Sequence, residues 1–116
     1  MITLTVAVAV VQLHMSAPPR NLLRETFLAC ARVESGLDPN ARNVAENAVG
    51  IVQIRPICLR DCNRIVGYNR WTLADRLDVA KSYAMFCVYV GYYAPTGTPE
   101  AWARVWNGGP RGAAKA

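Results

Sequence analysis

One glutamate stands where a charged side chain is costly. Residues 21–35 have the spacing of a helix, and Leu23, Phe27, Cys30 and Glu34 fall along its apolar side. In the last turn of that helix, burial and the negative end of the helix dipole both favour a protonated carboxyl. A carboxyl prepared in this way can act as a general acid. The alternative is a glutamate at the core edge that pairs with one of the many arginines.

Three segments of the sequence, the first of which contains this glutamate, resemble the motifs of a known family. Glu34-Ser35 is followed by Pro39 and Ala41, then by Gly50-Ile51-Val52-Gln53-Ile54-Arg55-Pro56, and near the end by Ala103-Arg104-Val105-Trp106-Asn107-Gly108-Gly109. In order and interval they resemble the Glu-Ser, Gly-Leu-Met-Gln-type and Ala-Tyr-Asn-type motifs of the soluble-lytic-transglycosylase (SLT), goose-lysozyme-like family. The resemblance covers roughly residues 22–110.

This resemblance implies a mainly α, lysozyme-like single helical domain with a substrate cleft. It also implies a lytic transglycosylase that cleaves the β-1,4 bond between N-acetylmuramic acid and N-acetylglucosamine in peptidoglycan. Glu34 would protonate the glycosidic oxygen and then, as a carboxylate, take the proton of the muramyl C6 hydroxyl, which closes a 1,6-anhydro ring. One carboxylate serves both steps because the attacking hydroxyl belongs to the substrate. No cofactor is implied.

Two other functions stay open. A lysozyme-type hydrolase of the same bond normally needs a second carboxylate, and the nearby acids are Asp38 and Glu46. We expect Asp38 to be solvated and to shape the turn before Pro39. The other alternative is a catalytically silent glycan-binding module.

The remaining site residues are carried over from the family motifs, each beside a structural alternative. Ser35 matches the family serine or solvates the helix end, and Gly50 allows a close approach of substrate or fits a turn. Gln53 matches a substrate-binding glutamine, whose amide can both donate to and accept from a glycan. Asn107 supports the cleft or ends the last helix.

The sequence departs from the family pattern near that last motif. Trp106 stands where a tyrosine is usual, so we expect it to contact substrate without supplying a hydroxyl near the acid. Tyr83, Tyr89 or Tyr93 could supply one, and Tyr93 is our candidate substrate contact. Ala48 and Val49 replace the small residues or serines common before the glycine.

The elements that must position these residues are helices joined by short loops. After the first helix we expect an exposed loop over 37–49 and a short helical turn around 49–54. A helix beginning at Pro56 should end at Gly67, and Thr72 should cap a short turn. Asp78 should begin the longest helix, with Val79, Tyr83, Phe86, Val90 and Tyr93 as its inward stripe. Thr98-Pro99-Glu100 should begin the last helix, which runs to Asn107.

Composition indicates one globular domain. The chain has 116 residues, of which 53% are hydrophobic and 18% charged, and its net charge is +5. A basic protein suits an anionic partner, either nucleic acid or an anionic cell wall. The arginines are scattered without a basic block or interleaved aromatic residues, which argues against nucleic acid. We therefore expect peptidoglycan strands as the partner of a monomer that does not insert stably into membranes.

The first residues allow two interpretations. The apolar run 2–11 fits the core of a signal peptide and is too short for a membrane span, although no Lys or Arg precedes it. Alternatively, it is a strand or helix that docks on the core. We therefore divide the chain into an N-terminal segment, 1–19, and a domain, 20–116. Because related domains usually continue further, this one should be short at its C-terminus. A periplasmic, extracellular or phage-delivered protein is expected.

Four cysteines, Cys30, Cys58, Cys62 and Cys87, leave a second choice open. Their even number is compatible with disulfides, but each lies in a predicted helix near its apolar side, which favours buried free thiols. Cys58 and Cys62, one turn apart, could form half of a metal site. The single histidine, His14, lies in the N-terminal segment, so we expect no metal.

Overall fold

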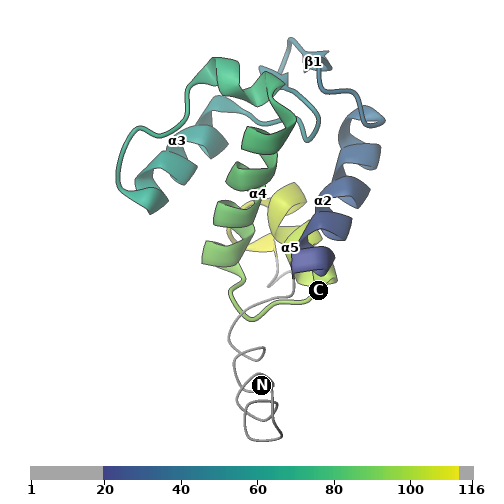
Figure 1. The fold of residues 1–116 in the computed structure, drawn as a ribbon, viewed down its shortest axis with the longest axis vertical. Helices are drawn as coiled ribbons and strands as arrows, with labels where there is room; N and C mark the ends of the chain where they lie inside the picture. Colours follow the sequence, from purple (N-terminus) through teal and green to yellow (C-terminus); the bar gives the residue numbers. More distant parts are fainter. Residues whose placement is uncertain (1–19, 113–116) are drawn as a thin grey trace, which may run out of the picture.

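The computed structural model describes residues 20–112, and this part of the chain is mainly helical. The N-terminal segment 1–19, for which a signal peptide and a docked element were both left open, lies outside the described residues. Helix α2 (Arg20–Ser35) is followed by strands β1 (Arg42–Asn43) and β2 (Ala48–Val49), helix α3 (Pro56–Val66), the 3-10 turn η1 (Leu73–Leu77), and helices α4 (Val79–Tyr93) and α5 (Pro99–Gly108). Figure 1 shows α4 in the middle, with α2, α3 and α5 around it. The mainly α, lysozyme-like prediction is confirmed.

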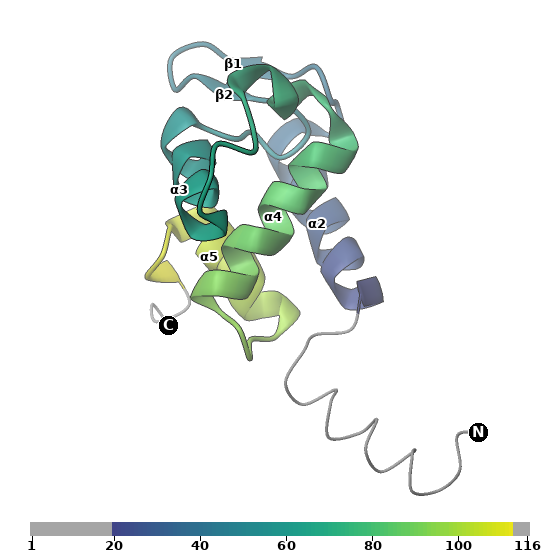
Figure 2. The same ribbon diagram turned by 60° about the vertical axis from the view of Figure 1, so that its left-hand side comes forward.

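The core forms where α4 meets its three neighbours. Met85, Phe86 and Val90 of α4 are completely buried, and Trp102 of α5 is almost so. Figure 2 shows α4 running obliquely between α2 and α3. Because helices cover it on several sides, its apolar residues do not follow a single stripe. The predicted stripe is therefore wrong at Val79, which is 42% exposed.

Local signals set the helix boundaries. The Asp78 carboxylate accepts a hydrogen bond from the Lys81 amide at 2.8 Å and begins α4, while the Thr98 hydroxyl does the same for α5. Gly67 ends α3 in the left-handed conformation. These three predictions are confirmed. However, α4, at 15 residues, is one shorter than α2 and is not the longest helix.

The prediction for residues 37–54 is wrong in two respects. Strands β1 and β2 form a small antiparallel hairpin whose second strand, Ala48–Val49, is buried. After it, the chain turns back and Val49 and Ile54 exchange backbone hydrogen bonds of 3.1 and 3.0 Å. Gly50 and Gln53 have φ values of +93° and +56°. A right-handed helical turn is therefore impossible there, and two-residue strands are too short to show alternation in the sequence.

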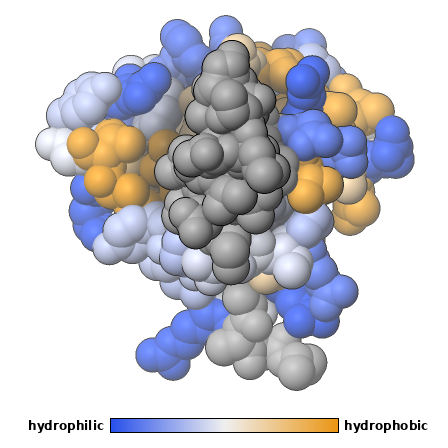
Figure 3. Space-filling model, turned by 60° about the horizontal axis from the view of Figure 1, so that its bottom comes forward, coloured by the Kyte–Doolittle hydropathy of each residue, from blue (hydrophilic) through white to orange (hydrophobic). Residues whose placement is uncertain are grey.

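The surface is mixed. In Figure 3 the visible face shows small hydrophobic patches among hydrophilic residues. Among residues 20–112 no helix has the length and apolar character needed to cross a membrane.

Candidate active site

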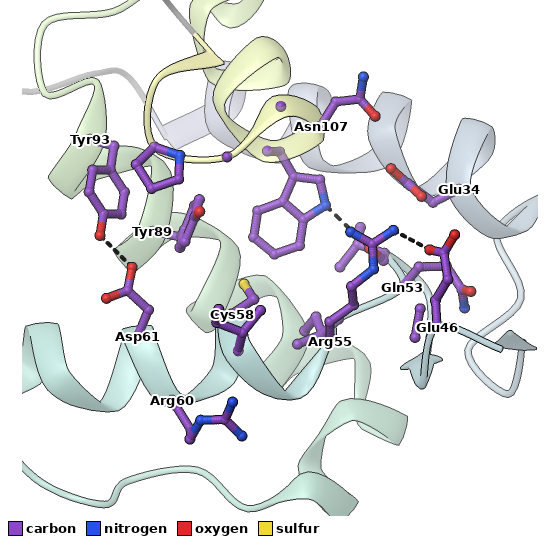
Figure 4. Close-up of a pocket in the computed structure, with 18 of the residues that line it drawn as sticks. Glu34, Glu46, Gln53, Arg55, Cys58, Arg60, Asp61, Tyr89, Tyr93 and Asn107 are labelled. Carbon is purple, nitrogen blue, oxygen red and sulfur yellow. Dashed lines mark hydrogen bonds and ion pairs between the residues drawn. The ribbon is translucent and has the colours of Figure 1, made fainter. Parts of the chain in front are cut away.

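A cleft of about 770 Å³ opens beside the end of α2. Its wall is made by the hairpin, the loop that follows it, α3, α4 and the C-terminal end of α5 (Figure 4). Of the seven candidate catalytic and substrate-binding residues, five line it: Glu34, Gln53, Tyr93, Trp106 and Asn107. Ser35 and Gly50 do not.

Glu34 is half-buried and takes part in no ion pair within the described residues. The pairing with an arginine that the sequence left open is thus not formed there. Burial raises the pKa of the Glu34 carboxyl; the positive charge of Arg55 opposes this, and the negative charge of Glu46 adds to it. The last turn of α2 therefore presents to the cleft a carboxyl that holds its proton more firmly than a solvated glutamate does.

Glu46 and Arg55 form an ion pair beside this carboxyl (Figure 4). Glu46 comes from the loop between β1 and β2, and Arg55 directly precedes α3. Their side chains are 50% and 54% exposed. Two charges of opposite sign therefore lie at the Glu34 end of the cleft.

Ser35 and Gly50 support the cleft wall from behind. The Ser35 hydroxyl donates to the Ile51 carbonyl at 2.7 Å and accepts from the Asp38 amide at 3.0 Å, which ties the end of α2 to the next loop. A Cβ on Gly50 would lie 1.9 Å from the Arg76 carbonyl oxygen. The close approach that Gly50 allows is thus between two backbone segments.

The Gln53 side chain lines the cleft, and its amide nitrogen is fixed by two hydrogen bonds to the backbone. Its Nε2 donates to the Ala41 and Gly50 carbonyls at 3.1 and 2.9 Å. These bonds use both amide hydrogens and hold the side chain in place. The carbonyl oxygen Oε1 is then the group that can accept a hydrogen bond in the cleft.

The family comparison can now be set beside this geometry. The family described as Transglycosylase SLT domain matches residues 14–94. The chain belongs to this family. No curated protein and no solved structure matches it. The matched region contains Glu34 and Gln53 but ends before α5, so the family match does not reach Trp106 and Asn107.

In this SLT domain, Trp106 forms part of the cleft floor. Its indole N–H donates to the Val52 carbonyl at 3.2 Å, and its ring lies 5.1 Å from Phe86 and 5.5 Å from Tyr89. Asn107 follows it, exposed, on the cleft edge. The indole is thus held rigidly and offers no hydroxyl.

The three tyrosines considered as a source of that hydroxyl lie in different surroundings. Tyr83 packs edge-on against Phe27 and does not line the cleft of the SLT domain. The Tyr93 hydroxyl donates to Asp61, at the opposite end of the cleft from Glu34 (Figure 4). Tyr89 is buried, which raises its pKa, and it lines the cleft between the two ends.

Sequence reasoning missed three residues that shape the SLT cleft. Arg55 lies two residues after Gln53, inside the segment that carries the glutamine motif, and this position is the one signal that could have found it. Asp61 gave no signal because its partner Tyr93 is distant in sequence. Arg76, buried, donates to the Asn47 and Ile54 carbonyls at 2.8 and 3.0 Å and so supports the hairpin and the loop.

The cysteines and metal ligands were further expectations. All four cysteines are free thiols; Cys62 is buried, and Cys30, Cys58 and Cys87 are half-buried, so the prediction of burial is right only for Cys62. His14, the single histidine, lies outside the described residues. Within the described part of the SLT domain, no group of three His, Cys, Asp or Glu side chains could hold a metal ion.

Proposed function

We propose that this SLT domain is a peptidoglycan lytic transglycosylase with Glu34 as its single catalytic acid and base. The supporting observation is an unpaired, half-buried carboxyl with a raised pKa that lines a cleft large enough for sugar rings. Membership of the family of transglycosylase domains indicates the substrate class, which is peptidoglycan.

In the proposed reaction, protonated Glu34 donates its proton to the glycosidic oxygen between N-acetylmuramic acid and N-acetylglucosamine. The bond from the muramyl C1 to that oxygen breaks, and N-acetylglucosamine leaves with the proton. The C6 oxygen of the same muramyl ring then bonds to C1, and its proton passes to the Glu34 carboxylate. The products are a 1,6-anhydro end and a regenerated acid, with no water consumed.

Four further residues are proposed to hold the glycan. The Gln53 carbonyl oxygen would accept a hydrogen bond from a sugar hydroxyl or an N-acetyl N–H. The Trp106 ring offers an apolar surface for a sugar face, and the exposed Asn107 amide offers both donors and an acceptor. Tyr93 lines the other end of the cleft and would contact a more distant sugar.

A hydrolase of the same bond is the alternative, since Glu46 lines the same cleft as Glu34. Asp38 does not serve this purpose: it is exposed, lies outside the cleft and accepts a hydrogen bond from the Asn40 amide at 2.9 Å. The ion pair of Glu46 with Arg55 favours transglycosylation, because it directs a Glu46 carboxylate oxygen to the guanidinium instead of to a water molecule.

The test is digestion of purified sacculi followed by mass spectrometry of the released fragments. Anhydro ends support the transglycosylase, and fragments heavier by one water support the hydrolase. Glu34→Gln should release neither, while Glu25→Gln, which changes an exposed glutamate of the same helix, should act like the wild type. Binding to sacculi without any fragment release by the wild type would instead indicate a silent glycan-binding module. Undiminished release by Glu34→Gln would refute the role of Glu34.

The substrate also sets the expected location and partners. Peptidoglycan lies outside the cytoplasmic membrane, so we expect the protein to act in the periplasm, outside the cell or as part of a phage. Its partner would be the glycan strand and not nucleic acid, bound by a monomer.

A further inference from the structure

Three charged or chargeable side chains meet at one end of the cleft, although they come from separate segments. Glu34 is in α2, Glu46 is in the loop of the hairpin, and Arg55 is the residue directly before α3. Only two of them, Glu46 and Arg55, are joined in an ion pair (Figure 4). Both carboxyls can attract Arg55, but only Glu46 pairs with it, so Glu34 is left without this partner.

The surroundings of Glu34 contain few other groups that could replace this arginine. Arg55 and Glu46 act on its carboxyl from the two facing segments, with opposite signs. On its own helix, the Cys30 thiol lies close enough for the two groups to influence each other. From α5, the cleft receives Asn107, which is uncharged. In this set, Arg55 is the only cation.

We propose that Glu46 is a positioning residue that holds the Arg55 guanidinium away from Glu34 and so leaves the catalytic carboxyl unpaired. This inference rests on the proposed function of Glu34 as acid and base. In this proposal Glu46 acts by positioning Arg55 and does not direct water.

The physical argument is a competition for one cation. Without Glu46, Arg55 would be free to pair with Glu34, on whose carboxyl its charge already acts, and an arginine beside a carboxyl favours the ionised form. Glu34 would then lose the proton that it must donate. Since the Glu46–Arg55 pair is about half exposed, it is weak and screened by solvent. Such a pair is strong enough to keep Arg55 with Glu46 instead of Glu34, but it contributes little to the free energy of folding.

The test is an NMR titration of the Glu34 side-chain carboxyl carbon in the full chain, with four proteins compared. Glu46→Gln should lower the pH at which Glu34 titrates, because Arg55 becomes free and a repelling charge is lost. Arg55→Gln should raise it, because the attraction is lost and Glu46 stays charged. The double variant should return close to the wild type, since both opposing effects are removed.

Cleavage of sacculi should follow the same order. At neutral pH, Glu46→Gln should lose about threefold to tenfold in rate and recover in mild acid, as a shift of up to about one pKa unit requires. The double variant should regain the lost rate. As a matched control, Glu100→Gln and Arg104→Gln break an exposed ion pair on α5 outside the cleft and should leave the titration and the rate unchanged.

The outcomes separate the two proposals. An unchanged Glu34 titration in Glu46→Gln would overturn the positioning role. So would a loss of rate at every pH that the double variant does not restore, since that is the behaviour of a base that directs water. The expected titration shifts in a protein that releases no fragments would support the positioning of Arg55 and refute the proposed enzyme.

Discussion

Glu34 and Asp61 both line the cleft, at its opposite ends, and both are partly withdrawn from solvent. Asp61 accepts hydrogen bonds from the Tyr93 hydroxyl and, at 2.8 Å, from Nε of Arg64. Among residues 20–112 Glu34 has no such partner, and Arg55, the cation that acts on its carboxyl, is paired with Glu46. The same groove thus contains one carboxylate whose charge is satisfied by the fold and one carboxyl whose proton is kept available. Proximity to the cleft alone does not distinguish the two; the partners do.

The largest expected effect is on catalysis, when the two carboxyls are neutralised in turn. Glu34→Gln should lower the cleavage rate by about a hundredfold to ten-thousandfold, the usual contribution of a general acid and base. Asp61→Asn should keep most of the rate, because its charge supports the fold and takes no part in proton transfer. Release of fragments from sacculi measures both. Equal losses in the two variants would break the comparison.

A second substitution tests the role of Gly50 in supporting the end of the cleft where Glu34 lies. Gly50→Ala should destabilise the protein by roughly 2–4 kcal/mol, because φ is +93° and the new Cβ would meet the Arg76 carbonyl. Chemical denaturation measures the loss. In amide NMR spectra, the shifts should concentrate in the hairpin and the 50–55 loop and spare Asp61 and Tyr93. Gly91→Ala is the control, since nothing lies within 4 Å of its added Cβ.

The third test asks how Glu34 and Asp61 each affect the stability of the folded protein as the pH changes. The pKa of Glu34 is higher in the folded protein, so folded Glu34 binds its proton more tightly, and stability falls as pH rises through that pKa. Glu34→Gln removes this loss and should raise the Tm at neutral pH but not in acid. Asp61→Asn should instead cost about 1–3 kcal/mol, because it removes a charged acceptor. Thermal melts over a pH series would show whether the two signs differ.

The sequence was sufficient for the features that depend on neighbours in the chain. The caps at Asp78 and Thr98 and the stop at Gly67 are local, so the helices were predictable. Glu34 was found because a helical period exposes a misplaced charge. The hairpin was missed because its two-residue strands are too short to show alternation, and a helical turn was wrongly predicted after it because Gln53 adopts a left-handed conformation that is uncommon for its residue type.

The partners in the cleft were not predictable for a different reason. Tyr93 and Asp61 lie on different helices, and Arg76 reaches the hairpin from η1. Such pairs are created by the packing of helices, and a single sequence contains no period or spacing that reports them. The motif therefore pointed to Glu34 as the candidate acid, whereas only the fold shows that its carboxyl forms no ion pair with the other described residues.

The smallest expected effect on stability comes from removing the Tyr93 hydroxyl, which donates a hydrogen bond to Asp61. Tyr93→Phe removes the hydrogen bond to Asp61 but keeps the ring, which packs 4.9 Å from Tyr89. Arg64 remains bound to Asp61, so the carboxylate stays paired and the cost should be about 0.5–1.5 kcal/mol. The cleavage rate and the Glu34 titration should not change, whereas Tyr68→Phe, which changes an exposed tyrosine outside the cleft, should change neither rate nor stability. A large loss of rate in Tyr93→Phe would mean that the two ends of the cleft act on the same reacting atoms.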